Sequence, residues 1–260
     1  MKSIKLPTRD KKGHKGTFGT VAVFGGHISE DSVMLGSAVF AGKAALKNGA
    51  GIVDFVADQR TLVQLIEMLP QAIGHTPENL QKTTKMWQSI VVGPGWEESD
   101  ENVKILEKIL RLEKPTVIDG TALNLISFNQ KLLKLIHSKC VLTPHIGEFK
   151  RLSKAIGIDD PTIFTQKYGC VLVLKSNVTT VTFGNDHWEH RGDNPVLATG
   201  GTGDVLAGLI GGFMAQYYPK LTLFEISKAA VETHAAAGKK WQAKKGDKGL
   251  IIDELIGLIS

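Results

Sequence analysis

Short runs of apolar, often β-branched residues alternate along the first two thirds of the chain with longer stretches whose pattern predicts helices. The apolar runs are residues 20–24, 52–56, 90–92, 116–118, 141–142 and 171–174, and the helical stretches include 31–48, 61–68 and 100–112. Continuous apolar strands separated by helices are typical of a parallel sheet that is covered on both faces. The pattern therefore predicts a doubly wound α/β domain.

The alternation of apolar strands and helical stretches ends at Lys175. Residues 179–183 and 187–190 are rich in strand-forming residues and flank the turn sequence 184–186, so this segment predicts a hairpin. Antiparallel strands are common at the edge of a mostly parallel sheet. The remaining segments are helical in pattern: 204–217, 224–244 and 251–259. There is no repeat or linker, and we expect residues 1–260 to form a single domain.

The composition narrows the class of protein. The net charge of +5 permits an anionic partner, but aromatic residues make up only 7% of the chain, and nucleic-acid binders usually combine basic with aromatic groups. No apolar run reaches the roughly 20 residues that cross a bilayer, and residues 1–15 lack the apolar part of a secretory signal. The only cysteines, Cys140 and Cys170, lie in or beside apolar runs, which favours buried, reduced thiols. We therefore expect a cytoplasmic protein with no nucleic-acid or membrane partner.

Glycines and polar residues follow the ends of most predicted strands. They are Gly25-Gly26, Gly93-Pro94-Gly95, Asp119, His145 and Lys175, and the segment 200–204 opens a predicted helix. In an open α/β sheet, ligands bind at the carboxyl ends of the strands. We therefore expect these residues to converge on one rim. The loop 15–19 matches neither the P-loop nor the dinucleotide fingerprint, which disfavours P-loop NTPases and Rossmann dehydrogenases.

The most informative of these segments is 194–212, which holds three glycines within four positions, Gly200, Gly201 and Gly203, followed at once by Asp204. Glycines at a helix N-terminus let backbone N–H groups approach an anion, and the helix dipole favours that anion. A carboxylate is misplaced in a pure phosphate cradle, but it fits a base that takes a proton from a hydroxyl attacking a phosphoryl group. The alternative is a tight turn in which Asp204 caps the helix.

The segment 143–148, Thr-Pro-His-Ile-Gly-Glu, also allows two interpretations. It is either a proline-containing turn in which Glu148 serves the first helical turn, or a site that places His145 at the rim and Glu148 near a magnesium–phosphate unit. On the helix that follows residue 224, His234 and Trp241 are separated by small residues, and we expect both to lie on a packed helix face.

Taken together, these segments resemble the NAD(P)H-hydrate dehydratase family of the ribokinase-like superfamily. The matching elements span nearly the whole chain; they are 15–19, 49–51, 93–95, Asp119 with 122–124, 142–149, 173–175 and 194–208. The resemblance implies a ribokinase-like fold and a repair reaction on NADHX and NADPHX, the redox-inactive hydrates of NADH and NADPH. ADP or ATP phosphorylates the ring hydroxyl of the hydrate, and elimination of phosphate restores the cofactor.

The resemblance also implies roles for individual residues. Asp204 would be the catalytic base, and the anion hole would be formed by Gly201, Thr202 and Gly203. The nucleotide would contact Lys175, Ser176, Asn177, Val178, Thr179 and Gly203, and the hydrate would contact Ala38, Gly95, His145 and Asp204. Glu148 would serve Mg²⁺ together with the phosphates. Family members often form tetramers, and this chain has no room for the epimerase domain of the bifunctional members.

Two departures from the family pattern stand in this chain. Ser176 follows the lysine where the family usually has glycine, and Thr121 stands where many members have a second aspartate. Two alternatives remain open from the sequence: a kinase that phosphorylates a small alcohol such as a vitamin precursor, and a non-catalytic nucleotide-sensing module. ADP is the usual donor in bacterial members and ATP in eukaryotic ones, and the sequence does not decide between them.

Overall fold

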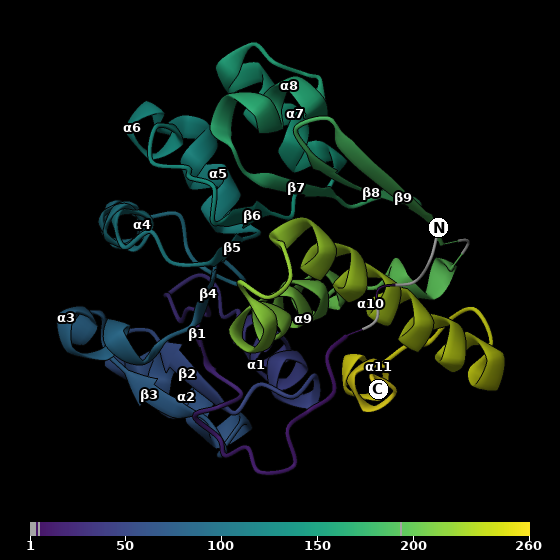
Figure 1. The fold of residues 1–260 in the computed structure, drawn as a ribbon. Helices are drawn as coiled ribbons and strands as arrows, with labels where there is room; N and C mark the ends of the chain where they lie inside the picture. Colours follow the sequence, from purple (N-terminus) through teal and green to yellow (C-terminus); the bar gives the residue numbers. More distant parts are fainter. Residues whose placement is uncertain (1–3, 5, 193) are drawn as a thin grey trace.

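The computed structural model describes residues 4, 6–192 and 194–260, and its centre is a nine-stranded sheet (Figure 1). The strands are β1 (Thr20–Phe24), β2 (Ile52–Val56), β3 (Ile73–His75), β4 (Ser89–Val92), β5 (Thr116–Ile118), β6 (Cys140–Leu142), β7 (Val171–Leu174), β8 (Val178–Phe183) and β9 (Asp186–Arg191). Their order is β3-β2-β1-β4-β5-β6-β7-β8-β9. Strands β1 to β7 pair in parallel, and β8 and β9 are antiparallel. The predicted parallel sheet with an antiparallel hairpin at its edge is confirmed.

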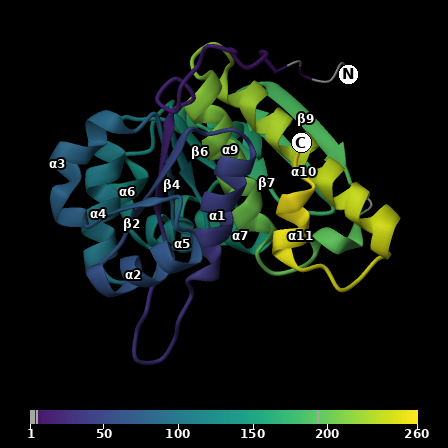
Figure 2. The same cartoon turned by 90° about the horizontal axis from the view of Figure 1, so that it is seen from below.

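Helices cover both faces of the sheet (Figure 2). They are α1 (Gly36–Lys47), α2 (Gln59–Met68), α3 (Leu80–Thr83), α4 (Asp100–Arg111), α5 (Thr121–Phe128), α6 (Gln130–Leu133), α7 (Ile146–Ile156), α8 (Pro161–Tyr168), α9 (Thr202–Tyr217), α10 (Leu223–Lys245) and α11 (Ile252–Gly257). Short 3₁₀ helices span Pro77–Asn79, Thr84–Met86 and Pro195–Leu197. Helices α1, α9 and α10 lie on one face, and α4, α5 and α7 lie on the other. Among the described residues, none of the helices has the length and apolar character that a membrane span requires.

Strand β1 shows why the central strands are apolar throughout. Val21 and Val23 join the core cluster on the α1 and α9 face, while Ala22 and Phe24 join the cluster on the opposite face. All four side chains are fully buried. Because both faces of a parallel sheet are covered, no position in such a strand faces water, and the sequence shows no alternation.

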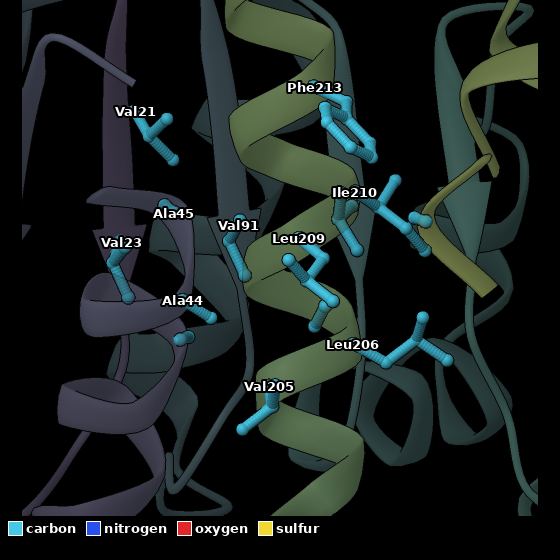
Figure 3. Packing of buried hydrophobic residues seen from close by; sticks show 14 of the residues in the cluster. Val21, Val23, Ala44, Ala45, Val91, Val205, Leu206, Leu209, Ile210 and Phe213 are labelled. Carbon is cyan, nitrogen blue, oxygen red and sulfur yellow. The ribbon is translucent and has the colours of Figure 1, made fainter. Parts of the chain in front are cut away.

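The small residues at the start of α9 allow it to lie against α1 (Figure 3). A Cβ atom on Gly208 would stand 2.2 Å from the backbone oxygen of Ala41, so any larger residue would push the two helices apart. One turn further along α9, a Cβ on Gly211 would meet Val91 of β4 at 2.4 Å. This close packing fixes the N-terminus of α9 at the rim of the sheet.

Several local predictions can now be compared with the structure. His234 and Trp241 are buried on α10, and Cys140 and Cys170 are buried free thiols, as expected. The helix predicted from residue 31 begins only at Gly36, because Ile28 and Val33 pair across an irregular loop. Strand β3 was not predicted.

Candidate functional site

The carboxyl ends of β5, β6 and β7 meet the N-terminus of α9. Asp119 follows β5, the segment 143–145 follows β6, and Lys175 follows β7. An isolated bridge joins His145 to Lys175, and the Lys175 N–H donates to the Pro144 carbonyl at 2.8 Å. Asp204 lies in the first turn of α9. The convergence of strand-end residues predicted from the sequence is present.

Lys175 and Asp119 form a buried ion pair at the centre of this rim. The Lys175 Nζ donates to Asp119 Oδ1 at 2.6 Å, and the Thr143 hydroxyl donates to the same oxygen at 2.7 Å. Burial opposes the charge on Lys175, but the carboxylates of Asp119, Glu148 and Asp204 outweigh it and raise the pKa of the lysine above its usual value. Lys175 therefore remains a cation in an otherwise acidic cluster, where it can contact an anionic ligand.

The pKa of Asp204 is strongly raised. Burial of its carboxyl group, together with the nearby charge of Asp119, raises its pKa to about 7, although a hydrogen bond with Ser37 and the charge of Lys175 act in the opposite direction. A carboxylate with a pKa near 7 holds protons far more strongly than an ordinary aspartate and still ionises at neutral pH. Such a group is suited to general-base catalysis.

The loop that leads into α9 exposes backbone donors beside Lys175. Gly201 has a φ of +95°, which favours glycine, and a Cβ on Gly203 would lie 3.2 Å from Lys175 Nζ. The Thr202 N–H donates to the Thr199 carbonyl at 3.3 Å, and its hydroxyl donates to the Leu197 and Thr199 carbonyls. Among the described residues, no backbone acceptor is paired with the N–H of Gly201 or Gly203. These two N–H groups are therefore available to receive an anion.

A cavity of about 570 Å³ opens beside Lys175 and Gly203. Of the residues predicted to contact a nucleotide, Lys175, Ser176, Asn177, Thr179 and Gly203 line it, whereas Val178 does not. Ser176 closes its loop on itself: its hydroxyl donates to the Val178 carbonyl at 2.6 Å and accepts from the Val178 N–H at 3.2 Å. The serine that replaces the usual glycine therefore stabilises the loop by a local turn.

Gly95, one of the residues predicted to contact the hydrate, is connected to Asp204 through a shared neighbour. Gly95 has a φ of +66°, and a Cβ there would stand 2.5 Å from the Met34 carbonyl oxygen and 3.0 Å from Ser37 Cβ. Ser37 in turn bonds to Asp204, so Gly95 and Asp204 share a neighbour. Ala38, the next residue, is fully buried. His145 is placed at the same rim through its bridge to Lys175.

His145 and Glu148 form a capping box at the start of α7. The His145 Nδ1 accepts from the Gly147 and Glu148 N–H groups at 2.9 and 3.3 Å, and Glu148 Oε2 accepts from the His145 N–H at 2.8 Å. Because Nδ1 accepts, the proton of the neutral ring is on Nε2, which lies 3.7 Å from Glu148 Oε1. The capping role expected for Glu148 is thus present, and Oε1 of Glu148 lies outside the cap.

Some residues of the site were missed or undervalued from the sequence. Asp119 was noted as a strand-end residue and as part of the family resemblance but was given no role, and Ser37 carried no signal at all. His190, Asn194 and His234 line the cavity from three different elements, and only the folded chain brings them together. Among the described residues, no cluster of three His, Cys, Asp or Glu side chains could hold a metal by itself.

Comparison with known proteins gives consistent results. A family model described as NAD(P)H-hydrate dehydratase matches residues 23–259. The ADP-dependent (S)-NAD(P)H-hydrate dehydratase of Lactiplantibacillus plantarum is 34% identical over 221 residues, which cover 81% of this chain and 77% of that protein. The bifunctional NAD(P)H-hydrate repair enzyme Nnr of Coxiella burnetii is 31% identical over 96% of this chain, and the chain spans about half of its length.

A solved structure shows the same similarity in three dimensions. The ADP/ATP-dependent NAD(P)H-hydrate dehydratase of Bacillus subtilis, co-crystallised with ATP and Mg²⁺, superposes with a TM-score of 0.77 at 25% identity. The match covers 98% of this chain and 92% of that one. The ribokinase-like fold class and the resemblance predicted from the sequence motifs are both confirmed.

Proposed function

Because the chain belongs to the NAD(P)H-hydrate dehydratase family, we propose that it uses ADP or ATP to convert NADHX and NADPHX back to NADH and NADPH. The observation that carries the proposal is the position of Asp204. A carboxyl group with a pKa of about 7 lies in the first turn of α9, beside a buried lysine and two free backbone N–H groups. This combination supplies a base and an anion site within one short segment.

The nucleotide occupies the cavity that Lys175, Ser176, Asn177, Thr179 and Gly203 line. Its phosphates extend towards the Lys175 ammonium and the N-terminus of α9, where the charge and the helix dipole both favour anions. The hydrate approaches Asp204 from the opposite side, beside Gly95 and His145. The exposed Nε2–H of His145 is available there to donate a hydrogen bond to the substrate.

Asp204 takes the proton of the ring hydroxyl while the hydroxyl oxygen attacks the terminal phosphoryl group of the nucleotide. The bond between that phosphorus and its bridging oxygen breaks, and the shortened nucleotide leaves. The N–H groups of Gly201 and Gly203 stabilise the negative charge on the transferred group. The new phosphate ester has a good leaving group, so phosphate departs and the neighbouring ring carbon loses a proton, which restores the double bond of the reduced nicotinamide.

The donor set also fits Mg²⁺ as a partner of the phosphates. Magnesium is commonly held by one or two carboxylates together with substrate phosphates and water. Glu148 would hold it through Oε1, the oxygen outside the capping box, and the ion would neutralise phosphate charge. The Bacillus subtilis relative was co-crystallised with ATP and Mg²⁺, which supports Mg²⁺ as a partner of the nucleotide.

Replacing Glu148 by glutamine separates its two roles. The amide oxygen of glutamine can still accept from the His145 N–H, so the Glu148→Gln protein should melt at nearly the wild-type temperature. Losing the charge should raise the Mg²⁺ concentration for half-maximal activity by about 10-fold or more. Glu148→Ala is the matched control, because it loses both roles and should also lose roughly 1 kcal/mol of stability. An unchanged Mg²⁺ dependence in the glutamine variant would remove Glu148 from the phosphate site.

Incubation of purified protein with NADHX tests the proposed reaction directly. The absorbance of the reduced nicotinamide should return with ADP or ATP present and stay absent without nucleotide. A control with a vitamin-type alcohol in place of NADHX tests the alternative that the protein is a small-alcohol kinase. Accumulation of a stable phosphorylated alcohol, with no recovery of NADH under any condition, would overturn the proposal.

Four further expectations come from the sequence and from the family resemblance. We expect residues 1–260 to act as a single dehydratase domain in the cytoplasm, assembled as a homotetramer, with no nucleic-acid or membrane partner. ADP is the donor named for the Lactiplantibacillus plantarum relative, and it is our first choice of co-substrate.

A further inference from the structure

The rim beside His145 carries a positive charge that the transfer of the phosphoryl group does not use. Arg151 lies on α7, one helical turn after Gly147, and it is exposed. A Cβ on Gly147 would stand 2.8 Å from Cε1 of His145 and 3.9 Å from Nη1 of Arg151. Long side chains on a helix lean towards its N-terminus, which brings the guanidinium back to the rim. The guanidinium and the imidazole are therefore neighbours at the start of α7.

A chain of hydrogen bonds holds this guanidinium in place. The Arg151 Nε donates to Asn124 Oδ1 at 3.1 Å, and Asn124 Nδ2 donates to Glu98 Oε1 at 2.9 Å. Asn124 lies on α5, which packs beside α7, and Glu98 lies in the loop between β4 and α4 (Figure 1). The chain joins three segments of the protein and fixes the guanidinium by its Nε edge.

The charge of Arg151 is not neutralised within the part of the chain that the structure describes. No carboxylate there pairs with its guanidinium, and its Nη1 and Nη2 groups make no hydrogen bond to the described residues. By contrast, Arg111 and Arg191 each bond to a glutamate. The guanidinium is a planar fork that binds two phosphate oxygens at once. In Arg151 this fork is oriented by Asn124, and both of its Nη groups are open to a ligand.

The hydrate brings an anionic group to this part of the rim. In NADHX and NADPHX the reacting ring is joined through a ribose to a diphosphate. With the ring hydroxyl at Asp204 and the ring beside His145, the diphosphate must pass the carboxylates of Asp204 and Glu148, which repel it. Lys175 is engaged with the phosphates of the nucleotide. Arg151, next to His145, is placed to supply the cation that the diphosphate needs.

We infer that Arg151 binds the diphosphate of the hydrate through Nη1 and Nη2, an inference that rests on the proposed function. Asn124 is a positioning residue, because it acts only by orienting the guanidinium. A hydrate without phosphate groups gains nothing from this contact. Arg151 therefore makes the protein select whole dinucleotide hydrates over smaller molecules that contain the same damaged ring.

The hydrate of reduced nicotinamide riboside is the sharpest probe, because it keeps the reacting ring and its ribose but has no phosphate. Arg151→Ala should lower the ratio of kcat/KM for NADHX to kcat/KM for this riboside hydrate by about 10-fold or more, the effect of losing a hydrogen bond between charged groups. The loss should appear in KM for NADHX and not in kcat, because the diphosphate is unchanged by the reaction. Arg151→Lys keeps the charge but not the fork, so its ratio should lie between those of the wild type and Arg151→Ala.

Two further variants separate recognition of the diphosphate from a general effect of charge or structure. Lys150→Gln is the matched control, because it removes the same charge from the adjacent exposed position of α7; it should keep the wild-type ratio. Asn124→Ala releases the guanidinium and should lower the ratio by a smaller factor than Arg151→Ala. An unchanged ratio in Arg151→Ala, or an equal loss of activity with both hydrates, would overturn the inference and leave the hydrogen-bond chain as a link between α5 and α7. A loss of ADP affinity as large as the loss for NADHX would also overturn it, because Arg151 would then serve the nucleotide.

The outcomes for this inference and for the proposed function are distinguishable. If NADHX is restored equally well with and without Arg151, the diphosphate contact is refuted and the dehydratase assignment stands. If the wild type never restores NADHX, the reaction is wrong, and calorimetric titration with NADH, which has the same diphosphate, tests the contact alone. Binding of NADH about 10-fold weaker to Arg151→Ala than to the wild type would support the contact, and equal binding would refute it.

Discussion

Replacing Asp204 by asparagine should reduce the turnover of NADHX by about 10²–10⁴-fold, the range for loss of a general base. The amide keeps the shape of the side chain but cannot take the proton from the ring hydroxyl. Binding of ADP should change little, because the Lys175 ammonium and the glycine N–H groups remain in place. The rate of NADH recovery and a calorimetric titration with ADP measure the two quantities separately. Turnover within about tenfold of wild type would show that Asp204 is not the base.

The pH dependence provides a second readout of the same residue. Only ionised Asp204 can accept a proton, so kcat/KM of the wild type should rise with pH and level off above a midpoint near 7, the raised pKa of this carboxyl group. An ordinary exposed aspartate would give a midpoint near 4. Ser37→Ala is an informative neighbour, because its hydrogen bond lowers the pKa of Asp204 and its removal should shift the midpoint to higher pH.

With rising pH, the stability that Asp204 contributes should fall while the activity rises. The pKa of Asp204 is about 7 in the folded chain and 3.8 in an unfolded reference, so between these values the unfolded state releases a proton that the folded state keeps. Stability contributed by this group therefore falls as the pH rises from about 4 to 7. Asp204→Asn removes that penalty and should be more stable than wild type at pH 8 by on the order of 2–4 kcal/mol, with no difference near pH 3.5. Chemical denaturation at the two pH values measures this, and it also shows that loss of activity is not loss of fold.

The central strands could be predicted from the sequence because burial on both faces leaves a direct trace in it. Every residue of β1 and β4 is buried, and the apolar runs at 20–24 and 90–92 follow from that. Strand β3 leaves no such trace. Its residues Ile73, Gly74 and His75 lie at the open edge of the sheet, where two of them are exposed, so their strand conformation depends on pairing with β2. Pairing of this kind cannot be read from local composition.

The residues of the candidate site likewise fall into those that could be predicted from local sequence and those that could not. Asp204 could be found because glycines and a carboxylate at a helix start are a local pattern with a chemical reason. The Lys175–Asp119 pair could not, since its partners are 56 residues apart and meet only because β5 and β7 flank β6. His234 was correctly expected on a packed helix face, yet that face also borders the cavity. A residue can be packed and still line a ligand site, and only the fold distinguishes the two.

Removing the positive charge of Lys175 should have the second large effect. In Lys175→Met, Asp119 stays buried without its partner at 2.6 Å, and breaking a buried pair in this way typically costs 3–5 kcal/mol. Nucleotide affinity should fall as well, because the ammonium is the cation nearest the free glycine N–H groups. The double variant Lys175→Met/Asp119→Asn should recover part of the stability, since it no longer buries an uncompensated charge, but it should not recover nucleotide binding. Urea denaturation and titration with ADP distinguish these outcomes.

Asp119→Asn alone tests whether this pair also sets the titration of the base. The charge of Asp119 raises the pKa of Asp204 and the charge of Lys175 lowers it, so the two neighbours act in opposite directions. In Asp119→Asn the like charge is gone and Lys175 is free to attract Asp204, so the midpoint of the kcat/KM profile should move below 7. A midpoint that stays in place would mean that the charge of Asp119 does not set the pKa of Asp204. A downward shift would show that the ion pair keeps the base protonated until near neutral pH, because the lysine that binds the nucleotide is engaged by Asp119 and not by Asp204.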